Sequence, residues 1–124
     1  MIYGTGTDMI EVARVARQVE KENGFKERIY SALEIEYCES MHHSSQHYAA
    51  RFAAKEAYFK ALGTGWRNGM GFAEVEVTND ELGNPHLVLH GKAREVAEER
   101  KIKKLHVSLT HLKDYANAIV ILEK

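Results

Sequence analysis

A glutamate and a lysine one helical turn apart, Glu56 and Lys60, are the residues whose types and spacing best suit chemistry. They lie in the stretch from Arg51 to Gly65, among aromatic and small apolar residues. One interpretation is a plain ion pair, because the i,i+4 spacing favours one on a helix. The other is that both face a ligand with a metal ion and phosphates, since carboxylates bind Mg²⁺ and an ammonium group neutralises phosphate oxygens.

The element that carries them is predicted to be a helix buried on most of its sides. Phe52 and Phe59 lie on one face of its helical wheel. Alanines form a second stripe: Ala50, Ala53, Ala54, Ala57 and Ala61. A helix that is apolar on most sides is buried on most sides, where a charge is costly unless it is paired or bound to a cation. Gly63, Thr64 and Gly65 end the helix, and we expect them to leave backbone N–H groups free.

The first segment of the chain, from Ile2 to Met9, is predicted to be a strand. Gly4 and Gly6 within it indicate that another part of the protein approaches its backbone closely. Asp8 and Glu11 then form an Asp-x-x-Glu pattern ahead of an apolar periodicity, which is typical of a helix capping box. We therefore expect Asp8 to cap a helix.

That helix is predicted to run from about Met9 to Asn23, and it carries basic side chains in one narrow sector: Arg14, Arg17 and Lys21. One interpretation is an ordinary solvated face. The other is a docking strip for an acidic partner protein, because complementary charge steers association.

Histidines cluster just ahead of the buried helix, at His42, His43 and His47. The spacing of the last two suits a metal site, but no acidic or cysteine ligand stands at a helical spacing with them. We expect a solvated cluster instead.

The C-terminal half is predicted to contain most of the strands. The segment from Leu105 to His111 alternates, and its polar residues share a face that lines either solvent or a pocket: His106, Ser108 and Thr110. The segment from Tyr115 to Leu122 is almost wholly apolar, which favours a central strand. A glycine-rich connection from Trp66 to Gly71 is expected to be a mobile loop over a site. Short turns between strand pairs imply an α+β fold, with an antiparallel sheet packed against helices.

The bulk composition predicts one compact domain over residues 1–124. A formal net charge of -1 gives no global field to attract nucleic acid or a membrane. Cys38 is the single cysteine, which excludes a disulfide framework. The sequence shows no long apolar run and no signal-peptide pattern, so we expect a cytoplasmic protein.

Four segments together resemble the holo-acyl-carrier-protein synthases, the short bacterial-type 4′-phosphopantetheinyl transferases. They are Gly4–Asp8 with Glu11, Arg51–Glu56, Lys60–Gly65, and His106–His111 with Lys113–Ala116. The resemblance covers essentially the whole chain in order. It implies that the 4′-phosphopantetheine group moves from coenzyme A to a serine of apo acyl carrier protein, with Mg²⁺ as cofactor. The by-product is adenosine 3′,5′-bisphosphate, and the reaction supports fatty acid biosynthesis.

The resemblance also implies roles for individual residues. Asp8 and Glu56 match the positions that bind Mg²⁺ together with the pyrophosphate, and Lys60 matches a lysine that contacts the phosphates. The turn near the phosphates corresponds to Gly63, Thr64 and Gly65. The positions expected near the nucleotide end of coenzyme A are occupied by Arg51, Asn84, Pro85 and His106. The family's carrier-docking helix matches the basic helix that carries Arg14, Arg17 and Lys21. The proton of the carrier serine goes either to Glu56 or to a water held at the metal.

The resemblance further implies a homotrimer in which each coenzyme A lies between two subunits. One rival hypothesis is a transferase for the carriers of peptide or polyketide synthases, but those relatives usually resemble a fused duplicate of such a chain. A second is a coenzyme A-binding module without turnover. A third is a structural oligomer in which Glu56 and Lys60 form a buried salt bridge. Leu112 departs from the family pattern, where a small polar residue often follows the histidine.

Overall fold

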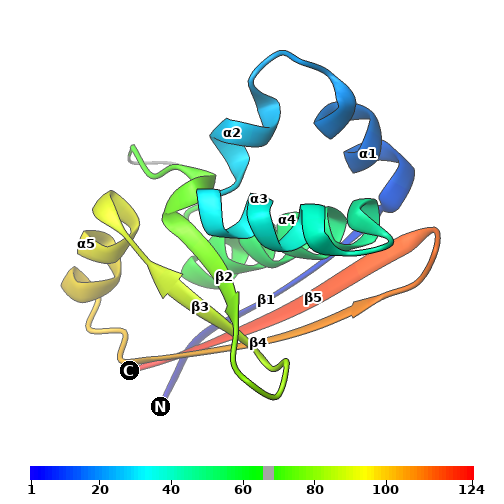
Figure 1. The fold of residues 1–124 in the computed structure, drawn as a ribbon. Coiled ribbons are helices and arrows are strands. Elements are labelled where there is room, and N and C mark those ends of the chain that lie inside the picture. Colours follow the sequence, from blue (N-terminus) through cyan, green and yellow to red (C-terminus); the bar gives the residue numbers. More distant parts are fainter. Residues whose placement is uncertain (66–68) are drawn as a thin grey trace.

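A computed structural model describes residues 1–65 and 69–124 (Figure 1). Its elements are β1 (Ile2–Glu11), α1 (Val12–Glu20), α2 (Phe25–Ile29), α3 (Ala32–Ser40), α4 (Ser44–Leu62), the 3₁₀ helix η1 (Phe72–Glu74), β2 (Val75–Asn79), β3 (Pro85–Leu89), α5 (Gly91–Glu99), β4 (Lys104–His111) and β5 (Tyr115–Glu123). The N-terminal strand, the buried helix and the last two strands are found where the sequence predicts them. The glycine-rich connection that the sequence predicts as a loop lies partly outside the described residues, since it includes residues 66–68. Of the helices in the described ranges, none is both long and apolar enough to cross a membrane.

The strands form two antiparallel sheets, a three-stranded sheet in the order β1-β5-β4 and a two-stranded sheet of β2 and β3. The prediction of an antiparallel α+β fold is confirmed, and so is the central position of β5. In the register of the larger sheet, Gly6 stands opposite Val120 and Asp8 opposite Ala118. Helix α4 lies across one face of this sheet, and α1 to α3 gather beyond it (Figure 1).

Helix α4 and strand β1 pack backbone against backbone, because glycine replaces side chains where they cross. A Cβ atom added to Gly4 would stand 2.0 Å from the Ala61 carbonyl oxygen, and one added to Gly6 would stand 2.0 Å from the Ala57 carbonyl oxygen. The alanine stripe of α4 is buried throughout. The close approach that the two glycines predict is therefore confirmed, and its partner is α4.

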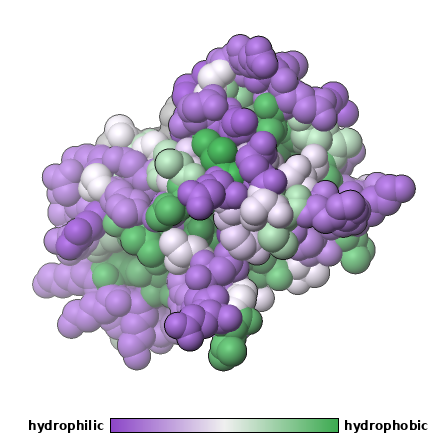
Figure 2. All heavy atoms as spheres, in the orientation of Figure 1, coloured by the Kyte–Doolittle hydropathy of each residue, from purple (hydrophilic) through white to green (hydrophobic). Residues whose placement is uncertain are grey.

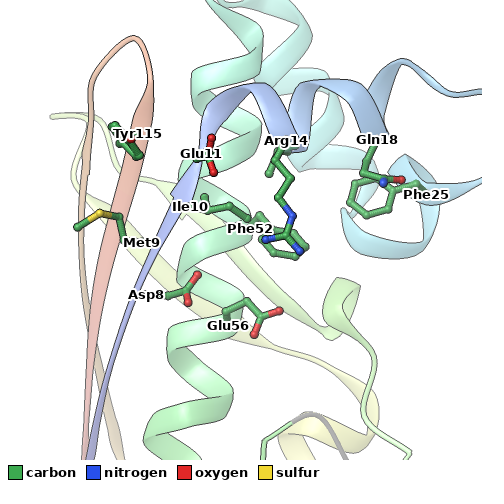
Figure 3. A pocket seen from close by; sticks show the side chains of 11 residues that line it. Asp8, Met9, Ile10, Glu11, Arg14, Gln18, Phe25, Phe52, Glu56 and Tyr115 are labelled. Atoms are coloured by element: carbon green, nitrogen blue, oxygen red, sulfur yellow. The ribbon is translucent and has the colours of Figure 1, made fainter.

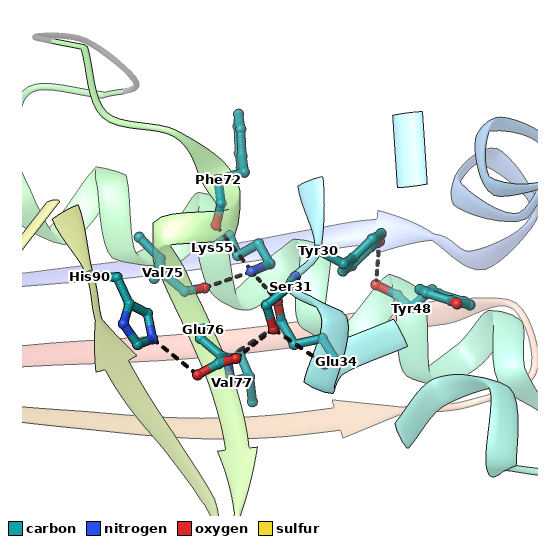
Figure 4. Close-up of polar contacts among 10 residues, drawn as sticks. All are labelled: Tyr30, Ser31, Glu34, Tyr48, Lys55, Phe72, Val75, Glu76, Val77 and His90. Carbon is teal, nitrogen blue, oxygen red and sulfur yellow. Dashed lines mark hydrogen bonds and ion pairs between the residues drawn. The ribbon is translucent and has the colours of Figure 1, made fainter. Parts of the chain in front are cut away.

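A buried charge network ties α4 to the smaller sheet (Figure 4). The Lys55 Nζ atom lies 2.7 Å from Glu34 Oε1, and both side chains have no solvent exposure. Lys55 also donates to the carbonyl oxygens of Phe72 and Val75, at 3.0 and 2.6 Å. Glu34 Oε2 accepts from the Val77 N–H at 3.0 Å. Because each charge has several partners, the network joins α3, α4 and β2 firmly.

The outer face of the larger sheet exposes apolar side chains. Ile2, Met9, Tyr115 and Ile119 are 58%, 68%, 52% and 44% exposed. Figure 2 shows a different face, over α2, α3 and the β2–β3 hairpin, where hydrophilic groups surround a band of apolar atoms. Exposed apolar residues that gather on one sheet face are typical of an interaction surface.

The helix that Asp8 was expected to cap begins later than predicted. Strand β1 continues to Glu11, which pairs with Tyr115, and α1 runs from Val12 to Glu20. Its N-cap is Glu11, which makes no side-chain capping hydrogen bond. The capping prediction for Asp8 is therefore wrong, because pairing with β5 holds the chain extended past the apparent helix signal.

Candidate active site

Asp8 and Glu56 meet in a cavity of about 720 Å³ between the end of β1, α1 and the middle of α4 (Figure 3). Its lining comprises Asp8, Met9, Ile10, Glu11, Arg14, Val15, Gln18, Phe25, Phe52, Glu56 and Tyr115. In the close-up the carboxylates of Asp8 and Glu56 lie next to each other at one end of the cavity. Two residues that are far apart in the sequence thus share one site.

The crossing of β1 and α4 explains this meeting. Alternate residues of a strand share a face, so Asp8 projects toward α4 as Gly4 and Gly6 do. Gly6 lies against Ala57, the residue that follows Glu56. The next residue on the same strand face is therefore brought to Glu56, and the backbone contact fixes the spacing.

Lys60 completes this group from the next turn of α4. Its Nζ atom lies 3.0 Å from Asp8 Oδ1 and donates to the Thr7 carbonyl oxygen at 3.0 Å. The Lys60 side chain is 53% exposed and the Asp8 side chain 16% exposed. Of the two interpretations of the Glu56–Lys60 spacing, the plain ion pair is wrong, since the lysine pairs with Asp8. Lys60 thus stays open to solvent beside two carboxylates.

The electrostatic state of Glu56 reflects this crowding. Burial raises the pKa of its carboxyl above the usual value, and the Asp8 carboxylate raises it further. Lys60 and Arg14 act in the opposite direction. Two carboxylates held together in a partly buried place are stabilised by a bound cation.

The donor set fits Mg²⁺ better than a transition metal. Mg²⁺ prefers oxygen ligands and is commonly held by one or two carboxylates, with waters and substrate phosphates in the other positions. Asp8 and Glu56 could supply two such ligands. Within residues 1–65 and 69–124 there is no group of three or more histidine, cysteine and acidic side chains placed to hold an ion. The metal interpretation of His42, His43 and His47 accordingly finds no support in the described part.

Helix α1 brings one predicted docking residue into the cavity. Arg14 lines it, while Arg17 is exposed on α1 and Lys21 follows the end of that helix. Sequence reasoning missed the apolar wall of the cavity, in which the rings of Phe25 and Phe52 stack at 6.3 Å between centroids. The only available signal was the aromatic character of these residues.

The turn after α4 is formed as its glycines predict, with one difference. Gly63 has φ +88° and Gly65 has φ +63°, which favour glycine. The Gly63 N–H donates to the carbonyl oxygens of Phe59 and Lys60, so it is not free for a ligand. Thr64 Oγ1 donates to the Gly65 carbonyl oxygen at 3.1 Å.

The residues predicted for the nucleotide end lie elsewhere on the chain. Arg51 and Pro85 line a second cavity of about 170 Å³. Asn84 is exposed in the β2–β3 turn, where its Nδ2 donates to Asp80 Oδ2 at 3.2 Å. His106 projects from the outer face of the larger sheet, with its Nε2 2.6 Å from Glu123 Oε2. None of these four residues lines the Asp8–Glu56 cavity.

Comparisons with known proteins agree with this architecture. The sequence profile of the 4′-phosphopantetheinyl transferase superfamily matches residues 4–120. A holo-[acyl-carrier-protein] synthase of Geobacter sulfurreducens is 50% identical over 125 residues, which cover 100% of this chain and 99% of the relative.

Solved structures show the same similarity. The crystal structure of the holo-[acyl-carrier-protein] synthase from Neisseria meningitidis superposes with a TM-score of 0.91 at 33% identity and covers 100% of both chains. A holo-(acyl-carrier-protein) synthase from Bacillus anthracis in complex with CoA (3′,5′-ADP) gives a TM-score of 0.81 at 35% identity, over 98% of this chain and 96% of that one. The chain therefore belongs to the 4′-phosphopantetheinyl transferase superfamily and, within it, to the holo-[acyl-carrier-protein] synthases.

Proposed function

We propose that this chain transfers 4′-phosphopantetheine from coenzyme A to a serine of apo acyl carrier protein at the Asp8–Glu56 cavity. The observation that carries the proposal is the meeting of two carboxylates and Lys60 at one end of an open cavity. Membership of the synthase family supports the reaction, and this geometry supports the proposed location of the active site. Adenosine 3′,5′-bisphosphate is the second product. We propose further that residues 1–124 act as one catalytic domain in the cytoplasm.

Asp8 and Glu56 would hold Mg²⁺, which supplies charge neutralisation to the pyrophosphate of coenzyme A. Lys60 lies beside Asp8 and is half exposed, so its ammonium group can turn from Asp8 to a phosphate oxygen. This places positive charge where negative charge develops as the P–O bond breaks. The family's turn near the phosphates corresponds here to Gly63, Thr64 and Gly65, one turn beyond Lys60. The nucleophile is the serine of the carrier.

Carrier docking is assigned to the basic side of α1. Arg14 lies in the cavity and Arg17 is exposed on the same helix, so both are accessible to an acidic protein. Lys21, just past the helix end, extends the charge. The net charge of the chain is only -1, so a local patch must provide the attraction.

We propose that the working form is a homotrimer, with each coenzyme A between two subunits. Arg51, Asn84, Pro85 and His106 would bind the nucleotide. Two observations support the assembly: these residues do not line the Asp8–Glu56 cavity of their own chain, and the outer face of the larger sheet exposes apolar side chains. A neighbouring copy would bring the two groups together.

The proposal is tested by mass spectrometry of an apo acyl carrier protein after incubation with this protein, coenzyme A and Mg²⁺. We expect the carrier to gain one phosphopantetheine on its serine, and we expect EDTA to abolish the gain. A folded protein that binds coenzyme A yet modifies no carrier would contradict the proposal and favour a binding module. Transfer that persists in EDTA would contradict the metal assignment alone.

A further inference from the structure

A buried lysine next to Glu56 has no part in the proposed chemistry. Lys55 has no solvent exposure, and its ammonium group carries three N–H donors. The acceptors are Glu34 Oε1 at 2.7 Å, the Phe72 carbonyl oxygen at 3.0 Å and the Val75 carbonyl oxygen at 2.6 Å. Because all three donors are taken, Lys55 acts on the rest of the protein and not on a ligand.

The bond to Phe72 differs from the other two, because it holds an aromatic residue against α4. The Phe72 ring stacks on Phe52, with centroids 5.8 Å apart and planes 9° apart. It also meets the Phe59 ring edge to face, at 5.3 Å between centroids. Phe52, Lys55 and Phe59 share one face of the helix, at the spacing i, i+3, i+7. One hydrogen bond and two ring contacts therefore anchor Phe72 on that face.

The anchored residue supports the apolar wall of the Asp8–Glu56 cavity. Phe52 lines this cavity and stacks on Phe25 of α2, at 6.3 Å between centroids (Figure 3). Phe52 thus joins the Phe72 ring to the cavity lining. Phe52 and Glu56 lie four residues apart on α4, so their side chains are neighbours on its surface. A shift of the Phe52 ring would change the space beside Glu56.

We propose that Lys55 is a positioning residue for the transfer reaction, which holds Phe72 so that the Phe52 ring keeps the cavity beside Glu56 in its productive shape. The inference rests on the proposed function, which places the transfer in this cavity. Reacting groups gain rate only when their placement is held to a fraction of an ångström, so a displaced wall costs activity even in a folded chain. Lys55 acts through Phe72 and Phe52.

Stability and positioning can be separated, because Lys55 has two kinds of partner. Lys55→Met alone leaves the Glu34 carboxylate buried without its cation, and adding Glu34→Gln removes that charge. The double variant Lys55→Met/Glu34→Gln still lacks the donor to the Phe72 carbonyl oxygen. It should therefore recover part of the stability and none of the anchoring of Phe72.

The test is the steady-state rate of phosphopantetheine transfer from coenzyme A to apo acyl carrier protein, at a temperature where circular dichroism shows the double variant folded. We expect kcat/KM to fall about 10- to 100-fold. The KM for the carrier should rise, because the wall and Arg14 line the same cavity. A smaller folded fraction would lower kcat and leave KM unchanged, so the KM distinguishes positioning from loss of stability.

Phe72→Leu tests the same ring with the charge network intact. It should cause a similar fall in kcat/KM and a similar rise in the carrier KM. Added to Lys55→Met/Glu34→Gln, it should cause less than about a twofold further loss, because both changes act through one ring.

The matched control is Ser31→Ala. Ser31 caps α3, and its Oγ donates to Glu76 Oε2 at 2.5 Å. The variant should melt at a lower temperature than the unchanged protein and keep its kcat and KM, since the lost bonds tie α3 to β2 and leave the Phe72 anchor in place.

The proposal is overturned if the carrier KM is unchanged in Lys55→Met/Glu34→Gln or in Phe72→Leu, whatever happens to kcat. An equal rise of KM in Ser31→Ala, or a full further loss from Phe72→Leu in the double variant, would also overturn it. These results would leave the proposed function standing. An unchanged protein that transfers nothing would overturn the proposed function and this inference with it.

Discussion

At the scale of single residues, the proposed metal site contains an unfavourable contact. Asp8 and Glu56 are held side by side, and both burial and the Asp8 charge raise the pKa of Glu56. Lys60 offsets part of this repulsion through its 3.0 Å contact with Asp8. A site of this kind trades stability of the free protein for affinity toward a cation.

Glu56→Gln should separate activity from stability. We expect transfer to fall by about 10² to 10³-fold or more, because an electrostatic contact to the reacting phosphates is lost. An acid whose pKa is raised by folding contributes its stability below the unfolded-state pKa and loses it as pH rises through the folded-state pKa. Glutamine does not ionise, so the variant does not lose stability in this way. At pH 7 without Mg²⁺ its melting temperature should equal or exceed that of the unchanged protein.

Thermal melts with and without Mg²⁺ check this prediction beside the activity assay. Mg²⁺ should raise the melting temperature of the unchanged protein and leave that of Glu56→Gln unaltered. Glu95→Gln, on the exposed side of α5, is the matched control and should behave as the unchanged protein does. Full activity in Glu56→Gln would show that the metal role belongs elsewhere.

At the scale of elements, the crossing of β1 and α4 sets the site. Their backbones touch through Gly4 and Gly6. Both proposed metal ligands lie beside the contact of Gly6 with Ala57, since Asp8 is two residues after Gly6 and Glu56 directly precedes Ala57. The Lys55–Glu34 network fixes the other side of α4 against β2. Helix α4 is thus held on both sides by contacts that leave it little freedom.

Gly6→Ala should destabilise the fold through steric overlap. The new Cβ would stand 2.0 Å from the Ala57 carbonyl oxygen and 2.7 Å from the Ala61 nitrogen, so the helix must move. Overpacking of this kind typically costs about 1–3 kcal/mol. Urea denaturation measures the loss. Gly71→Ala is the matched control, since its nearest neighbour, Glu74 Cγ, would be 4.0 Å away. Equal stability of the two variants would show that β1 and α4 are not in such close contact.

Lys55→Met should be more damaging, because it leaves the Glu34 carboxylate buried without its cation. Breaking one partner of a buried pair costs about 3–5 kcal/mol. The double variant Lys55→Met/Glu34→Gln should recover part of this loss in denaturation experiments, since it removes the uncompensated charge. Lys92→Met, at an exposed position of α5, should have little effect. A double variant no more stable than Lys55→Met would contradict the charge argument.

Much of this element arrangement follows from sequence patterns, and the exceptions have physical causes. The burial of α4 and the central place of β5 follow from their continuous apolar character. The start of α1 does not, because pairing of Glu11 with Tyr115 overrides the local capping signal. The partner of Lys60 was also missed, since helical spacing favours Glu56 and the preferred carboxylate, Asp8, comes from another element. The role of Lys55 depends on Glu34, on a separate helix.

At the scale of the whole molecule, the residues proposed to bind the nucleotide lie apart from the Asp8–Glu56 cavity within one chain. His106 projects from the outer face of the larger sheet, and Asp8 from the inner one. The outer face also exposes Met9, Tyr115 and Ile119. A second copy packed on this face would cover the apolar side chains and carry its own nucleotide residues toward the first chain's carboxylates.

Ile119→Lys should therefore disrupt assembly and activity together. A charge placed in an apolar interface is costly to bury, so we expect the mass measured by light scattering to fall from that of three chains toward one. Coenzyme A affinity should fall with it, while circular dichroism should show a folded chain. Val88→Lys, at a position 39% exposed on the smaller sheet, is the matched control. If the unchanged protein itself has the mass of one chain, the trimer proposal is wrong.

The contact of bare backbone between β1 and α4 has a consequence for how such a protein changes over evolutionary time. The separation of Asp8 and Glu56 is set by main-chain atoms at Gly4 and Gly6, not by the sizes of core side chains. Substitutions elsewhere in the core can then accumulate without altering the distance between the two carboxylates. A lineage can drift widely in sequence and keep its chemistry, provided that these two glycines persist.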